Sequence, residues 1–85
     1  MKKVYYKIID PVNDITLAGC RVYPDYNYRK VVEVLLKELG INADDYRERT
    51  PITNAQDSIP GMPEYYMTQG YVYGTSKLVS ITVVG

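Results

Sequence analysis

The chain has 85 residues, of which 46% are hydrophobic, and its ten basic and ten acidic side chains give a net charge of zero. This length and composition predict one folded domain and differ clearly from those of a disordered chain. Zero net charge supplies no long-range field toward a polyanion, and no apolar run approaches the roughly 18 residues that a membrane span needs.

All ten aromatic residues are tyrosines, and the chain has no phenylalanine, tryptophan or histidine. Tyrosine suits half-buried positions and contact surfaces, because its ring is apolar while its hydroxyl needs a partner when buried. Without histidine the chain cannot build a Ser-His-Asp or Cys-His arrangement or an ordinary zinc site. We therefore expect no enzymatic activity, no bound metal and no cofactor.

The first part of the chain predicts a β-hairpin. Residues 3–9 alternate, with Val4, Tyr6 and Ile8 on one side and Lys3, Tyr5 and Lys7 on the other. Turn-forming residues at 10–14 end this strand, and residues 15–23 form the next. In the second strand either Thr16, Ala18, Cys20 and Val22 face inward, or Ile15 and Leu17 do so with a bulge near Gly19.

Cys20 is the only cysteine of the chain. We expect its side chain to be buried as a small apolar group rather than to react, because free cysteines are often core residues. A single thiol also favours a reducing compartment, which indicates a cytoplasmic protein.

Apolar side chains recur at helical spacing at Tyr28, Val31, Val32, Leu35, Leu36 and Leu39. This spacing predicts one amphipathic helix. Asp25 is expected as its N-cap, with Asn27 as the rival, and Gly40 with Ile41 is expected to end it in a Schellman-type motif. Residues 42–46 predict a single capped helical turn beyond it.

Residues 50–63 contain three of the five prolines and predict a long loop, with a short edge strand around Ile52 as an option. Residues 64–73 and 77–84 predict two further strands, because Gly74, Thr75 and Ser76 between them form a hairpin signal. The β-branched side chains of 77–84 favour a central place in the sheet.

These elements predict an α+β fold, in which one main helix packs on one face of a small mixed or antiparallel sheet of four to five strands. The predicted order, β-β-α-(short helical turn)-β-β, resembles the ubiquitin-like β-grasp along most of the chain. The resemblance implies a scaffold or modifier domain. Modifiers of that family end in a diglycine tail, whereas this sequence ends in Val83, Val84 and Gly85.

Clustered tyrosines beside the predicted loop indicate a surface that contacts another protein, since tyrosine and methionine are enriched in interface cores. The candidate contact residues are Tyr65, Tyr66, Tyr71, Tyr73, Ile59 and Met62. Alternation along the strand puts Tyr65, Met67, Tyr71 and Tyr73 on one side and Tyr66 on the other. The competing interpretation is that these rings border the domain's own core with their hydroxyls outward.

We therefore expect a non-enzymatic protein-binding module or an accessory subunit of an assembly, with self-association as a further option and no membrane partner. Size, neutrality and the lack of catalytic groups resemble those of small inhibitors from phages and mobile elements, anti-CRISPR proteins among them. That resemblance implies a bacterial or phage-infected cell. The alternatives are the ubiquitin-like domain and a small protein that binds single-stranded nucleic acid. Binding of nucleic acid would use Lys3, Tyr5 and Lys7 with Tyr71 and Tyr73.

Overall fold

The computed structural model describes residues 1–54 and 65–85 of the chain. The elements in chain order are β1 (Lys2–Asp10), β2 (Ile15–Tyr23), α1 (Tyr28–Glu38), the 3-10 turn η1 (Ala43–Asp45), β3 (Tyr46–Asn54), β4 (Tyr65–Val72) and β5 (Leu78–Val84). The strands of these ranges form one five-stranded sheet in the order β2-β1-β5-β4-β3, and all neighbours are antiparallel. The predicted α+β class is confirmed, and β5 is the central strand, as expected.

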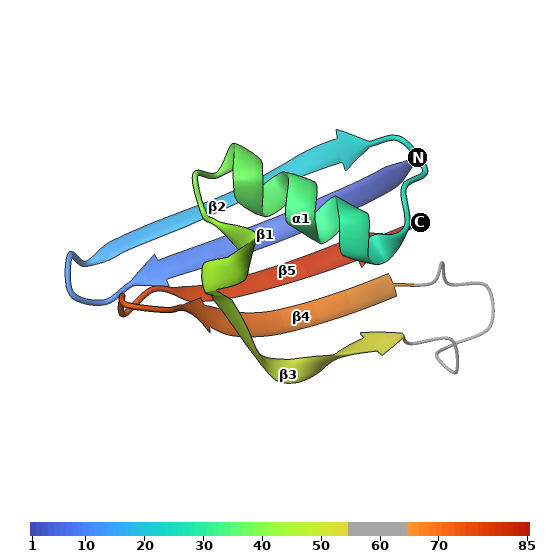
Figure 1. The fold of residues 1–85 in the computed structure, drawn as a ribbon. Coiled ribbons are helices and arrows are strands. Elements are labelled where there is room, and N and C mark those ends of the chain that lie inside the picture. Colours follow the sequence, from blue (N-terminus) through green and yellow to red (C-terminus); the bar gives the residue numbers. More distant parts are fainter. Residues whose placement is uncertain (55–64) are drawn as a thin grey trace.

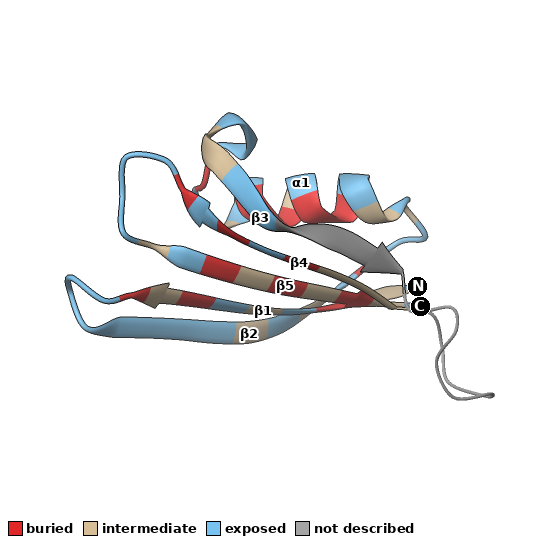
Figure 2. Ribbon diagram, turned by 90° about the horizontal axis from the view of Figure 1, so that it is seen from below, coloured by how far each residue is buried: buried red, intermediate tan, exposed pale blue. Residues whose placement is uncertain are grey.

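The chain crosses from β2 at one edge of the sheet to β3 at the other edge through α1 and η1, so α1 lies over the sheet (Figure 1). Figure 2 shows α1 on one side of the sheet, while the other side carries no helix of the described residues. The fold therefore has two layers, and one face of the sheet is left open.

The edge strand expected around Ile52 exists but is longer than predicted, because β3 begins directly after η1 at Tyr46. Residues 50–54, predicted as the start of a loop, belong to this strand, and that part of the prediction is wrong. The remainder of the predicted loop, residues 55–63, lies outside the described residues. Two register shifts interrupt the pairing of β3 with β4, next to Pro51. The sequence of β3 therefore lacks the regular alternation of apolar and polar residues from which a strand is predicted.

The core lies between α1 and one face of the sheet. As predicted, Val31, Val32 and Leu35 are buried, while Leu39 is only partly buried. The core side chains are Val4, Ile8, Tyr23, Val31, Val32, Leu35, Leu36, Ile41, Val72, Val79, Ile81 and Val83. On β5 they are every second residue, and on β1 Val4 and Ile8 share one side with the partly buried Tyr6, so the intervening residues point to the open face.

On β2 the second of the two predicted orientations holds. Ile15 and Leu17 lie on the helix side, opposite Asp10 and Ile8 of β1, and the pairing runs through Gly19 without a bulge. Cys20 consequently lies on the open face and is exposed, so the expectation of a buried thiol is wrong. The reason is the register of the hairpin, because Cys20 pairs with Tyr5, whose side chain also points to the open face.

The helix ends are capped by side chain and backbone. Asn27, not Asp25, is the N-cap, because its side-chain oxygen accepts a hydrogen bond from the Lys30 N–H at 2.8 Å. At the other end Gly40 has φ 77°, and the Ile41 N–H donates to the Leu36 carbonyl at 2.9 Å, which completes the predicted Schellman motif. The predicted helical turn after it is η1, which Asn42 caps by accepting from the Asp44 N–H.

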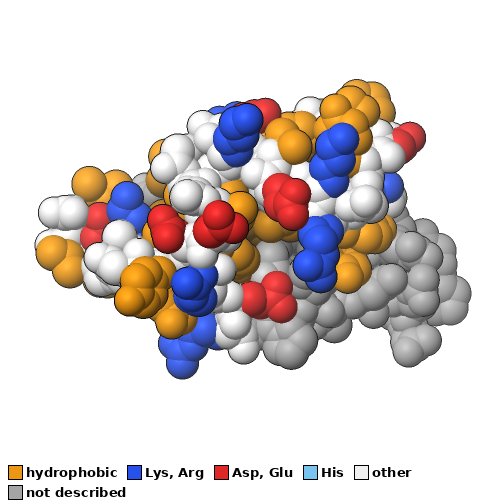
Figure 3. Space-filling model, viewed as in Figure 1, with side chains coloured by type: hydrophobic (Ala, Val, Ile, Leu, Met, Phe, Trp, Pro, Cys, Tyr) orange, Lys and Arg blue, Asp and Glu red, His pale blue; other side chains and the backbone are white. Residues whose placement is uncertain are grey.

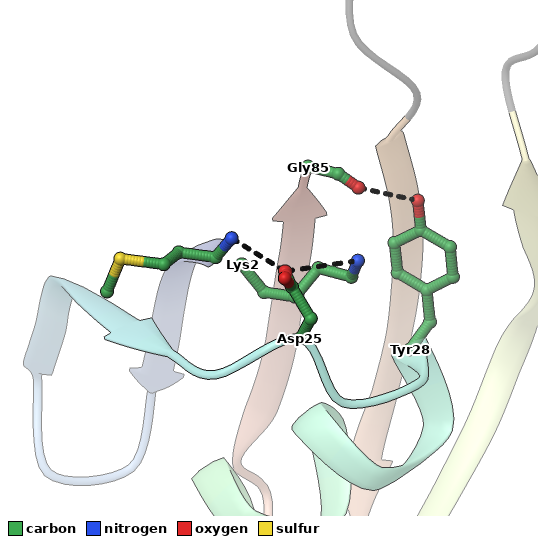
Figure 4. Close-up of polar contacts among 5 residues, drawn as sticks. Lys2, Asp25, Tyr28 and Gly85 are labelled. Carbon is green, nitrogen blue, oxygen red and sulfur yellow. Dashed lines mark hydrogen bonds and ion pairs between the residues drawn. The ribbon is translucent and has the colours of Figure 1, made fainter.

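Side chains at the start of α1 contact the strands beneath (Figure 4). The Asp25 carboxylate forms an ion pair with the Met1 ammonium at 2.6 Å, and the Lys2 ammonium lies 4.0 Å from the same carboxylate oxygen. The Tyr28 hydroxyl donates to the Gly85 carbonyl at 3.2 Å. These contacts fix the end of the helix at which β1 starts and β5 ends.

Candidate interaction surface

The open face of the sheet is the surface that the fold leaves without a second layer in the described part of the chain. Antiparallel pairing aligns its side chains in rows across β2, β1, β5 and β4. The rows hold Val22, Lys3, Val84 and Tyr65; then Cys20, Tyr5, Thr82 and Met67; then Ala18, Lys7, Ser80 and Gln69; and last Thr16, Ile9, Leu78 and Tyr71.

Several large apolar side chains on this face are accessible to solvent. Tyr5 is 48% exposed, Leu78 is 45% exposed and Tyr71 is 36% exposed. Soluble proteins expose single apolar side chains routinely, but several large ones on the same face of a sheet are typical of a contact surface.

The charged groups of this face are basic. Lys3 and Lys7 stand on β1, and Arg49 stands on β3, with β5 and β4 between these two strands. In the described strand residues the two acidic side chains, Asp10 and Glu48, belong to the helix side, with Glu48 bonded to the buried Thr68. Figure 3, which views the helix side, shows Asp and Glu side chains there together with Lys and Arg. The chain is neutral as a whole, yet the charges of the described strand residues are unevenly divided between the two faces.

A shallow hollow of about 510 Å³ spans the last two of these rows on the open face. Ile9 and Leu78 supply apolar lining, Gln69 and Ser80 supply polar groups, and Lys7 and Arg49 supply positive charge. Arg49 follows Glu48, which lies on the helix side, so alternation along β3 places Arg49 on the open face.

The predicted contact residues do not all share one surface. Tyr65 and Tyr71 lie on the open face, and Tyr73 follows β4 as an exposed residue with the Arg47 guanidinium 5.2 Å from its ring centroid. Tyr66 lies on the opposite side from Tyr65 and Tyr71, as alternation predicted; this is the helix side, where its ring stacks on that of Tyr28. Ile59 and Met62 lie outside the described residues.

Tyrosines on the helix side have the hydroxyl partners that burial requires. The Tyr23 hydroxyl donates to Glu38 at 2.9 Å, and burial, followed by this carboxylate, raises the pKa of Tyr23. The Tyr46 hydroxyl lies 2.8 Å from that of Thr68, and burial is the largest cause that raises the pKa of Tyr46. The rings of Tyr23 and Tyr46 therefore border the core. Of the clustered tyrosines to which the competing sequence interpretation applied, Tyr66 also packs against the core.

Sequence reasoning missed Ile9, Leu78 and Arg49 as surface residues. The alternation of β5 already separated Leu78 from Val79 and Ile81, and only the position of α1 decides which set is exposed. Arg49 was missed because no strand was predicted at residues 47–49, so alternation assigned it no side.

None of the helices in the described part of the chain is long and apolar enough to cross a membrane. Within residues 1–54 and 65–85, no three metal-binding side chains come together. Comparison of the chain with protein-family models, with curated proteins and with solved structures found no match.

Proposed function

We propose that this protein is a non-enzymatic binding module that docks another protein on the open face of its sheet. The observation that carries the proposal is the exposure of Tyr5, Tyr71 and Leu78 on a face over which residues 1–54 and 65–85 form no second layer. An inhibitor of the phage type and an accessory subunit of an assembly both work through such a contact.

The composition of the face supports a protein partner. Tyrosine rings lose little side-chain entropy on contact, and their hydroxyls keep the free surface wettable. Aliphatic side chains such as Ile9 and Leu78 lie between the rings and supply area for apolar packing.

Single-stranded nucleic acid is the second candidate, since Tyr5 stands between Lys3 and Lys7 on β1. Successive bases stack on neighbouring rings, but Tyr65 and Tyr71 are six residues apart on one strand, which is about 20 Å. Tyr5 lies two strands from both. This spacing favours a protein partner over a stacked strand of bases.

The test is affinity capture from the source cell with three baits, followed by measurement of Kd for the protein that is captured. The baits are the wild type, Tyr5→Ala/Tyr71→Ala, and Arg29→Ala/Lys37→Ala as a matched double variant on the exposed side of α1. We expect the open-face variant to lose about 2 kcal/mol or more, roughly thirtyfold in Kd. The helix variant should bind as the wild type does.

Each variant must first show the circular-dichroism spectrum and denaturation midpoint of a folded protein. If the helix variant loses the partner while the open-face variant keeps it, the docking surface is the helix side and the proposal is wrong.

A further inference from the structure

The division of charge between the two faces bears on the chemistry of the partner. Lys3, Lys7 and Arg49 are exposed on or beside the open face, and no acidic side chain of the described strand residues shares it. Among residues 1–54 and 65–85, no ion pair involves Lys7 or Arg49. Both cations are therefore available to a ligand without the loss of an ion pair among these residues.

The hollow between these cations combines two kinds of lining. Ile9 and Leu78 offer an apolar wall, while Gln69 and Ser80 offer hydrogen-bonding groups close to Lys7 and Arg49. A guanidinium binds a carboxylate through paired hydrogen bonds, and an ammonium adds a less directional charge. A side chain with an apolar stem and a carboxylate end matches this arrangement.

We infer that the partner is a protein with an acidic contact segment, and that the Lys7–Arg49 hollow receives a glutamate or aspartate side chain of that segment. This inference rests on the proposed function and specifies its partner. Charge complementarity of this kind raises the association rate and rejects basic surfaces. It also argues against a second copy of the chain stacked face to face, since that would bring cations against cations.

The direct probe is a synthetic peptide in which glutamates alternate with leucines, and its control is the same peptide with glutamine for every glutamate. Binding is measured by the shift of backbone amide signals in NMR titrations at low and physiological salt. The wild type should bind the acidic peptide more tightly than the neutral one, with shifts in Lys7, Ile9, Gln69 and Leu78. Salt should weaken the binding, because the exposed charges are screened.

Two double variants carry the same net charge, because each exchanges two cations for two glutamates. Lys7→Glu/Arg49→Glu should lower affinity for the acidic peptide by about tenfold or more, whereas Arg29→Glu/Lys37→Glu should lower it much less. If Lys7→Glu/Arg49→Glu fails to fold, Lys7→Ala/Arg49→Ala replaces it in the experiment. This variant should also bind the acidic peptide more weakly than the wild type does. Equal losses in the hollow and helix variants would overturn the inference, because they would report net charge alone.

A single-stranded oligothymidine is the third probe. If it binds the open face more tightly than the acidic peptide, and charge reversal in the hollow abolishes that binding, the partner is a nucleic acid and the inference is wrong. Binding of the captured protein to the two variants tests the docking face and the acidic segment separately. Loss of its binding in Tyr5→Ala/Tyr71→Ala but not in Lys7→Glu/Arg49→Glu would retain the docking face and reject the acidic segment.

Discussion

The rings of Tyr28 and Tyr66 stack with centroids 4.5 Å apart and planes within 9° of each other. This pair joins the first turn of α1 to the inner face of β4, while Tyr65, one residue earlier, points to the open face. One step along a strand therefore separates a tyrosine that holds the fold together from one that is available for contact.

The Tyr66→Ala variant should accordingly lose stability and keep its binding. We expect the free energy of unfolding to fall by about 2 kcal/mol, because a half-buried ring and its stacking partner are lost. Chemical denaturation measures this change, and the folded fraction of the variant should bind the captured partner with unchanged Kd. A loss of affinity without a loss of stability would place Tyr66 in the contact surface.

Leu35→Ala tests the packing of the helix on the sheet. Leu35 is fully buried, as are Val4 and Ile81 of the same core. Truncation should cost about 2–5 kcal/mol, through lost apolar burial and the cavity that remains. A denaturation midpoint close to that of the wild type would mean that the helix does not pack as described.

Cys20 should react in the folded protein, since its side chain is exposed on the open face. A chromogenic thiol reagent should modify it without denaturant, at a rate that does not depend on the stability of the variant used. Leu35→Ala is a suitable comparison, because it is destabilised but leaves the surroundings of Cys20 intact. A rate that rises with destabilisation would show that the thiol is reached only through unfolding.

Asp10 should contribute to the pH dependence of stability. The Asn13 side-chain amide donates to its carboxylate at 2.8 Å, and this hydrogen bond is the largest cause that lowers the pKa of Asp10. A folded-state pKa below the unfolded value of about 3.9 means that the carboxylate stabilises the fold above that pH. The contribution is lost as the pH falls through the folded-state pKa.

The measurement compares urea midpoints of the wild type and Asp10→Asn from neutral pH down to below pH ~3. The difference between them should narrow as the pH falls under about 4. If the difference between the two urea midpoints is constant over this pH range, the hydrogen bond between Asn13 and the Asp10 carboxylate is not the cause of that difference.

The parts of the fold that the sequence predicted are those with a clear period. Val31, Val32 and Leu35 repeat at helical spacing, and Val79, Ile81 and Val83 repeat at strand spacing, so α1 and β5 follow from pattern alone. The sequence could not decide between Asp25 and Asn27 as the N-cap, because both side chains are good hydrogen-bond acceptors. Only the position of the Lys30 N–H in the structure decides between them. The edge strands were harder, since β2 is apolar on both sides and β3 is broken by register shifts.

The candidate surface was predictable only in part. Alternation separated Tyr66 from Tyr65 and Tyr71, but it could not say which set the helix covers. The hollow depends on side chains from four strands, including Lys7, Leu78 and Gln69, whose proximity follows from sheet order. Sequence separation hides such a group, because β1 and β5 lie at opposite ends of the chain.

The ten tyrosines give the most direct test of the docking face, because they report on both sides of the sheet at once. With isotope-labelled tyrosine rings, each ring signal is followed by NMR while the captured partner is added. We predict that Tyr5, Tyr65 and Tyr71 shift or broaden first, while Tyr23, Tyr28 and Tyr66 on the helix side keep their positions. Perturbation of Tyr28 and Tyr66 with unchanged Tyr5 and Tyr71 would contradict the account and move the contact surface to the helix side.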